Sequence, residues 1–198
     1  MRSLTGQTTL RTFSKNLLTQ QNYDDLIVKL NTGGIAFDAT HGLGQASATS
    51  TLVLAAFGGF DDVRVVGIMK FPSPTTAGAE DLGLVMGMRN VETIGAGANY
   101  LYIRVAAGNA RIVSVIAGSF STLTTAAWSV AQGVAITIDA TRVGRLVTAT
   151  FTAASGPAPV TLSFTLPSDS PLLPGGLCGF RSLSKAVWCS SLTAEQLA

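Results

Sequence analysis

The feature that most constrains this chain is a period of two in its apolar residues, repeated over many short segments. In VAITIDA (134–140), valine and isoleucine alternate with alanine, threonine and aspartate. The segments RLVTATFT (145–152) and VTLSFTL (160–166) follow the same rule. Successive side chains of a β-strand point to opposite faces, so each of these segments predicts a strand with one buried face.

Turn residues separate these segments from further apolar runs of strand length. The other runs lie at 62–71, 82–88, 99–106 and 111–118. Glycine, proline and asparagine cluster between them, as in Pro72–Pro74 and Gly108–Asn109. Short strands joined by turns, with no long helical period between them, predict an all-β fold, namely an antiparallel β-sandwich or barrel.

Composition indicates what kind of surface such a fold presents. The chain has 198 residues, which suits one domain with a full hydrophobic core. Only 12% of the residues are charged, about half the share of a typical soluble domain. The surface must then consist largely of threonine, serine, alanine and glycine, and a weakly charged surface favours association. We therefore expect a homo-oligomer or a subunit of a larger assembly.

Two classes of partner are disfavoured by the sequence. The apolar stretches 51–60 and 110–120 are too short to cross a bilayer as helices, so we expect no membrane insertion. The first residues lack the apolar core of a signal peptide, which predicts synthesis in a cytoplasm. The net charge is only +2 and the basic residues are scattered along the chain, so we expect no nucleic-acid partner.

The chain divides into a distinct beginning and a strand-rich remainder. Residues 1–33 show no sustained alternation, and the spacing of apolar residues allows a short helix around 14–30. This segment is either an N-terminal arm that docks onto a partner or a first strand and loop packed on the domain. Residues 34–198 are expected to form the β-sandwich.

The order of the elements in this remainder resembles a known family. GGIAFDATHG (33–42) precedes DVRVVGIMKF (62–71), Trp128 leads into the strand pair at 134–152, and GGLCGFRSLSKAVWCSSL (175–192) closes the chain. This pattern is similar to the concanavalin A-like jelly roll in its laminin-G-like form. Similar domains occur in bacteriophage virion proteins, lectins and glycanases, and the fold alone does not choose among them.

Within that resemblance, Cys178 and Cys189 are expected on the two arms of a closing hairpin with its turn near Leu183–Ser184. Each cysteine lies among apolar residues, which favours buried, reduced thiols, with a cross-strand disulfide as the alternative. The spacing is not that of a zinc site and the chain has one histidine, so no metal is expected.

Catalytic patterns are absent from the sequence. His41 is the only histidine, and no G-x-S-x-G motif accompanies it. The acidic residues form no alternating row on a strand, as a jelly-roll glycanase would use. The pairs Asp61–Asp62 and Glu80–Asp81 are a weak candidate for calcium, and solvated loops are the favoured interpretation. We expect no enzyme activity, no catalytic residue and no cofactor.

One surface is a candidate for glycan binding. Tyr100, Tyr102 and Arg104 share one face of the strand at 99–106, and the loop around His41 is assigned to the same site. The alternative is that the tyrosines cover a second sheet or a subunit interface. A second, uncharged face forms if the strands carrying Thr148–Thr152 and Thr161–Thr165 pair.

These observations lead to two functional hypotheses. The first is a non-enzymatic structural virion protein, a bacteriophage capsid-decoration or tail/fibre subunit that assembles with other virion proteins and is located in the virion. The alternative is a carbohydrate-binding adhesion module for a cell-surface glycan. A glycan-cleaving enzyme ranks last.

Overall fold

The computed structural model describes residues 11–18, 26–31, 35–45, 51–70, 81–90, 97–182 and 188–198. All regular structure in these ranges is β-strand, and every described pairing is antiparallel. The predicted all-β class is confirmed. The same ranges hold no helix long and apolar enough to cross a membrane.

One sheet has eight described strands. Its order is β13-β12-β11-β6-β15-β4-β3, and β1 also pairs with β15. The strands are β1 (Thr12–Asn16), β3 (Ile35–Asp38), β4 (Gly42–Gln45), β6 (Val63–Lys70), β11 (Ala135–Val143), β12 (Leu146–Ala153), β13 (Val160–Thr165) and β15 (Trp188–Gln196).

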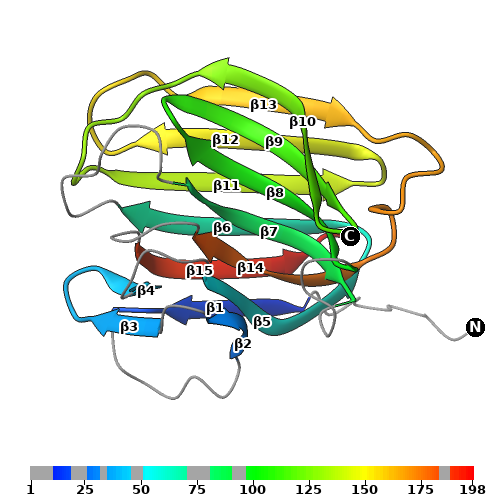
Figure 1. Ribbon diagram of the computed structural model, residues 1–198, viewed down its shortest axis with the longest axis horizontal. Helices are drawn as coiled ribbons and strands as arrows, with labels where there is room; N and C mark the ends of the chain where they lie inside the picture. The colour runs from blue at the N-terminus through cyan, green and yellow to red at the C-terminus, as the bar shows by residue number, and fades with distance from the viewer. Residues whose placement is uncertain are drawn as a thin grey trace, which may run out of the picture.

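The second sheet has seven described strands in the order β10-β9-β8-β7-β14-β5-β2. They are β2 (Leu26–Asn31), β5 (Thr51–Phe60), β7 (Asp81–Arg89), β8 (Asn99–Ala106), β9 (Asn109–Ile116), β10 (Ser119–Ala127) and β14 (Gly176–Ser182). The two sheets overlap when the molecule is viewed down its shortest axis (Figure 1). Together they form a sandwich.

Two tight turns set the register of β8, β9 and β10. Ala107 and Gly108 both have positive φ, at 48° and 71°, and Ala117 and Gly118 repeat this at 49° and 80°. Two-residue turns with two positive φ angles match the twist of a β-hairpin. The turns therefore place β8, β9 and β10 side by side in the seven-stranded sheet.

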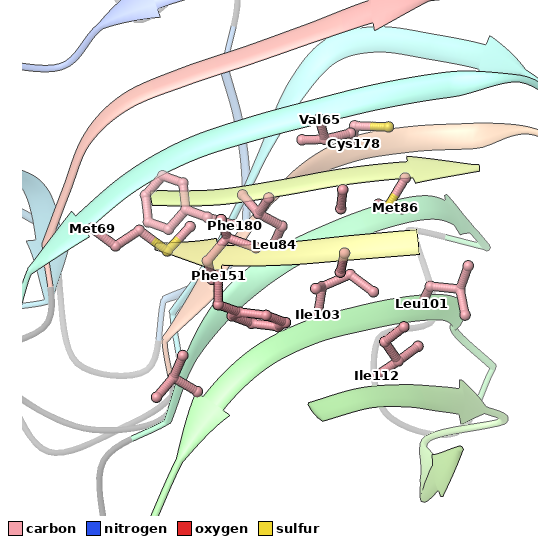
Figure 2. Close-up of a cluster of buried hydrophobic side chains, with 14 of the residues drawn as sticks. Val65, Met69, Leu84, Met86, Leu101, Ile103, Ile112, Phe151, Cys178 and Phe180 are labelled. Carbon is pink, nitrogen blue, oxygen red and sulfur yellow. The ribbon is translucent and has the colours of Figure 1, made fainter. Parts of the chain in front are cut away.

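The main core lies between the sheets. Strands of both sheets contribute alternate residues to it, as in β6, where Val63, Val65 and Met69 are buried. Figure 2 shows part of this cluster, in which Phe151 from one sheet lies near Leu84 and Ile103 from the other. Trp128 packs on Phe151 at 5.9 Å between ring centroids and donates its indole N–H to the carbonyl of Ala158 at 2.9 Å. The structure therefore confirms that the alternating apolar residues of these strands are buried.

The beginning of the chain differs from part of its prediction. Residues 12–16 and 26–31 are strands. A helix over 14–30 is therefore the wrong interpretation for both ends of that segment. β1 pairs with β15 in one sheet, and β2 pairs with β5 in the other. Partners far away in sequence supply these hydrogen bonds, and a local helical period cannot reveal them. The proposed boundary at residues 33 and 34 lies outside the described residues.

The closing hairpin is also a wrong prediction. Cys178 lies on β14 and Cys189 on β15, and these strands belong to different sheets. Both cysteines are free and buried on the inner faces of the sandwich. Because the two strands belong to opposite sheets, the two cysteines enter the common core from opposite sides.

A fully buried arginine joins three chain segments at one end of the sandwich. Arg142 is 1% exposed. Its guanidinium donates to the carbonyls of Asp61 at 2.6 Å, Leu172 at 2.8 Å and Phe60 at 3.1 Å. Burial lowers the pKa of Arg142, since desolvation disfavours its charge. The contacts are all to backbone, which identifies a structural role.

Candidate binding face on the seven-stranded sheet

The strand β8 divides its side chains between two clusters. Leu101, Ile103 and Val105 face the main core, as the alternation predicted. Tyr100 and Tyr102 belong to a second buried cluster, with Val85, Met88, Ala98, Val113 and Val115. This second cluster lies on the opposite, outer face of the seven-stranded sheet, because its members alternate with core residues along each strand.

Three arginines lie in one row across that outer face. Arg104 stands directly opposite Arg111 on β9 and opposite Gly83 on β7. Gly83 in turn pairs with Arg181 on β14. Neighbouring strands are about 4.8 Å apart. The row therefore brings together side chains that are up to 77 residues apart in sequence, as Arg104 and Arg181 are (181 − 104). We call Arg104, Arg111 and Arg181 the arginine row.

Glycine at position 83 is required by this close packing. A Cβ atom there would lie 2.7 Å from the Cβ of Arg104 and 2.2 Å from the carbonyl oxygen of Ile103. Real Cβ atoms do not approach other atoms so closely, so a larger residue would push β8 away. Gly83 thus allows Arg104 to occupy its place between β9 and β7.

Aromatic rings support the arginines. The Cζ atom of Arg181 lies 5.0 Å from the ring centroid of Phe120, 5.9 Å from that of Tyr102 and 6.0 Å from that of Tyr100. The Cζ atom of Arg104 lies 5.6 Å from the Tyr102 ring. Guanidinium groups within about 6 Å of a ring face are attracted to its electrons. Two cations therefore share the Tyr102 ring.

Hydrogen bonds hold the same groups in place. Arg181 donates from Nη1 to the hydroxyl oxygen of Tyr100. The hydroxyl of Tyr102 donates to the backbone carbonyl of Arg181 at 3.1 Å. Both tyrosines and Arg181 are therefore fixed relative to one another before any ligand binds.

The exposure of these residues differs sharply. Tyr100 and Tyr102 are 2% and 0% exposed, whereas Phe120 is 44% exposed and the three arginines are partly exposed. A sugar cannot stack on a buried ring, so the two tyrosines form a floor beneath Arg104 and Arg181. Among the described residues that surround this floor, Phe120 and the arginine row are accessible. We call this surface, with its tyrosine floor, the arginine–aromatic face.

The structure brings together only part of the predicted site. Tyr100, Tyr102 and Arg104 share a face as expected. His41 does not join them, since it lies in the turn between β3 and β4 of the other sheet, with its ring 6.1 Å from that of Trp188. Whether any of these residues binds a glycan stays a prediction.

Sequence reasoning missed Phe120, Arg111 and Arg181. The basic residues looked scattered because they are far apart along the chain, and cross-strand pairing is what gathers them. Part of the signal was present: Arg111 alternates with Ala110 and Ile112, which predicts that it points away from the core.

The described residues contain no group of three histidine, cysteine or acidic side chains that could hold a metal. Asp61 accepts a hydrogen bond from Gly175 N at 2.9 Å, and Asp62 accepts one from Gly144 N at 2.6 Å. These carboxylates stabilise turns. Glu80, the other part of the calcium candidate, lies outside the described residues.

A separate pocket lies at the edge of the sandwich, with a volume of about 250 Å³. Mainly apolar side chains line it, among them Ile116, Leu123, Phe164 and Leu172, with Asp169 as its acid. It offers few polar groups to orient a ligand, whereas the arginine–aromatic face offers many. The face is therefore the better candidate site.

Comparison with known proteins identifies the fold. No family model matches the sequence, and no curated protein matches it. Among solved structures, lectin II from Ulex europaeus is similar with a TM-score of 0.70 and 12% identity, over 94% of this chain and 99% of that one.

Two bacterial structures are also similar. The carbohydrate-binding module CBM66 from Bacillus subtilis has a TM-score of 0.60 and 11% identity, over 87% of this chain and 92% of that one. A Bacillus subtilis protein of unknown function with a galectin-like fold has a TM-score of 0.69 and 11% identity, over 93% of this chain and 94% of that one. The chain thus has the lectin-like, concanavalin A-like jelly-roll fold that its strand order resembles.

Proposed function

We propose that this protein is a non-catalytic carbohydrate-binding module that binds glycan on its arginine–aromatic face. The observation that carries the proposal is the partly exposed Phe120 beside Arg181, which belongs to a row of three arginines, two of them packed on buried tyrosine rings. An aromatic ring offers a flat apolar surface for a sugar ring, and guanidinium groups donate several hydrogen bonds in a fixed geometry.

The fold supports this proposal without establishing it. Similar structures include a lectin and a carbohydrate-binding module, and the fold also hosts other functions. What is specific to this chain is the gathering of donors and an aromatic ring on one sheet face. Binding sites typically combine apolar surface with a few well-placed polar groups.

Affinity gel electrophoresis in a panel of soluble polysaccharides tests the proposal. We expect retardation by at least one polysaccharide, with no release of reducing ends on prolonged incubation. Phe120→Ala should weaken binding about tenfold, equivalent to about 1.4 kcal/mol. Leu146→Ala is the matched control, since Leu146 is 48% exposed on the other sheet. Equal effects of the two substitutions would contradict the assigned face.

Assembly within a virion is a second proposal, favoured by a different surface. β12 pairs with β13, which is the condition on which the threonine face depended, and Thr150 Oγ1 lies 3.0 Å from Thr161 Oγ1 on the outer face of the eight-stranded sheet. Ile68, Val143 and Leu146 are exposed on the same face. The same face also carries the Arg64–Asp139 and Arg64–Glu195 ion pairs, which neutralise one another in part. A face that combines threonine and apolar side chains with paired charges is suited to burial against another subunit.

The solution mass tests this second proposal. Light scattering should report a homo-oligomer that becomes a monomer when Val143 and Leu146 are both replaced by serine. A monomer at every concentration, with no attachment to other virion proteins, would remove support for the capsid-decoration or tail/fibre role and for a virion location.

A further inference from the structure

We propose that the arginine–aromatic face selects anionic glycans, meaning polysaccharides that carry carboxylate or sulfate groups. This inference rests on the proposed carbohydrate-binding function and narrows its ligand. The inference is argued from the charge and spacing of the three arginines and from the ring contacts that hold Arg104 and Arg181 in place.

The first step concerns like charges in register. Arg104 and Arg111 occupy directly opposite positions, and Arg181 lies one strand beyond Gly83. Side chains directly opposite each other across two strands are about 5 Å apart at Cβ, and like charges there destabilise a sheet. An anion that lies between opposed cations replaces part of their mutual repulsion with attraction.

The second step concerns preorganisation. The Arg104 and Arg181 guanidinium groups both lie within 6 Å of the Tyr102 ring, and Arg181 is also bonded to Tyr100. Long arginine side chains usually lose freedom when they bind a ligand, which weakens binding. Here ring contacts and hydrogen bonds already restrict them, so less freedom remains to be lost.

The third step concerns an unused donor. Arg111 Nε is buried and has no hydrogen-bond partner among the described residues. A buried N–H without an acceptor is costly, and a ligand oxygen would satisfy it. Carboxylate and sulfate groups supply two or more acceptor oxygens in the spacing that a guanidinium group matches.

The fourth step concerns why the anion belongs to a glycan. Phe120 is 44% exposed and borders Arg181, with 5.0 Å between the Arg181 Cζ atom and the ring centroid. An apolar sugar face on Phe120 would carry its acidic group towards the arginine row. A small inorganic anion would use the arginines and leave the ring uncovered.

The experiment compares polygalacturonate with its fully methyl-esterified form by isothermal titration calorimetry. The two polymers share a backbone, and only the first is charged. Dextran sulfate and dextran form a second pair that distinguishes sulfate from carboxylate. We expect binding to at least one charged polymer, at least tenfold weaker binding to its neutral partner, and weakening as sodium chloride is raised.

Substitutions locate the site. Arg111→Gln and Arg104→Gln should each weaken binding of the charged polymer about tenfold, equivalent to about 1.4 kcal/mol. Arg145→Gln is the matched control, because it removes the same charge from an exposed turn between β11 and β12. Unchanged thermal unfolding midpoints show that the variants are folded. An equal loss in Arg145→Gln would overturn the site.

The remaining outcomes separate this inference from the proposed function. Equal binding of the charged and esterified polymers would overturn the inference while leaving carbohydrate binding intact. Failure to bind any polysaccharide would overturn both. Binding of a single-stranded oligonucleotide as tightly as polygalacturonate would also overturn the inference, since the face would then bind polyanions of any class.

Discussion

At the scale of single residues, Arg142 shows how one buried charge can organise a fold. Its three guanidinium nitrogens each donate to a backbone carbonyl of the β5–β6 turn or of the loop before β14. The alternation puts Arg142 at an inward position of β11, in step with Ile136 and Ile138, where an apolar residue is expected. That position is the signal in the sequence that distinguishes it from the exposed arginines.

Replacing Arg142 by methionine should destabilise the protein severely. The substitution keeps the volume of the side chain but leaves the carbonyls of Phe60, Asp61 and Leu172 without donors. The Leu172 hydrogen bond is buried and the other two are part-buried, so the three losses together should lower the free energy of unfolding by about 3 kcal/mol.

Urea denaturation measures this change. Arg145→Met is the control, because Arg145 is exposed two residues beyond the end of β11, and its effect should stay within about 0.5 kcal/mol. A similar small effect for Arg142→Met would show that its hydrogen bonds contribute little.

At the scale of elements, the placement of the last two strands determines where the two cysteines lie. Both strands were anticipated as strands, but their pairing was not. β14 inserts between β5 and β7, and β15 inserts beside β6. Alternation tells which residues of a strand point together, and it does not tell which strand lies next to it. The hairpin interpretation failed for that reason.

Burial between the sheets should make both thiols unreactive in the folded protein. A thiol reagent applied below pH 9 should detect no thiol before unfolding and both after unfolding in guanidinium, without reductant. Detection of no thiol after unfolding would indicate the disulfide alternative.

The same burial makes stability depend on alkaline pH. Desolvation raises the pKa of Cys178 to about 11 and that of Cys189 to about 12, from 9.0. Because the unfolded thiols lose protons first, this contribution is fully present below pH 9 and is lost as the pH rises towards 11 and 12. The Cys178→Ala/Cys189→Ala variant should show a shallower fall in unfolding free energy over this window. An identical slope would contradict the burial.

At the scale of the whole molecule, the two ends of the chain stabilise each other. β1 pairs with β15 over five positions, from Thr12–Glu195 to Asn16–Ser191. Leu17 is fully buried and donates its N–H to the carbonyl of Ser190 at 2.9 Å. The described beginning of the chain is therefore part of the eight-stranded sheet.

Deleting residues 1–18 should lower the thermal unfolding midpoint markedly. Loss of a buried leucine alone typically costs about 2–5 kcal/mol, and the strand pairing is lost as well. The control is Thr12→Ala/Ser14→Ala, which removes exposed side chains of β1 and keeps Leu17. A deletion variant as stable as the control would mean that β1 does not contribute to the fold.

The amino-acid sequence by itself determined the strands and their buried faces, because a side-chain period of two is a local property that residue order encodes directly. It placed Tyr100 and Tyr102 on one face with Arg104, and it placed the threonines of β12 and those of β13 each on one face of their own strand. Only the tertiary structure decided sheet membership, the separation of Cys178 from Cys189, and the assembly of the arginine row. Those features depend on pairing between strands that are far apart in sequence. Which strands become neighbours is determined by contacts that exist only in the packed sheets, so local residue order does not encode it.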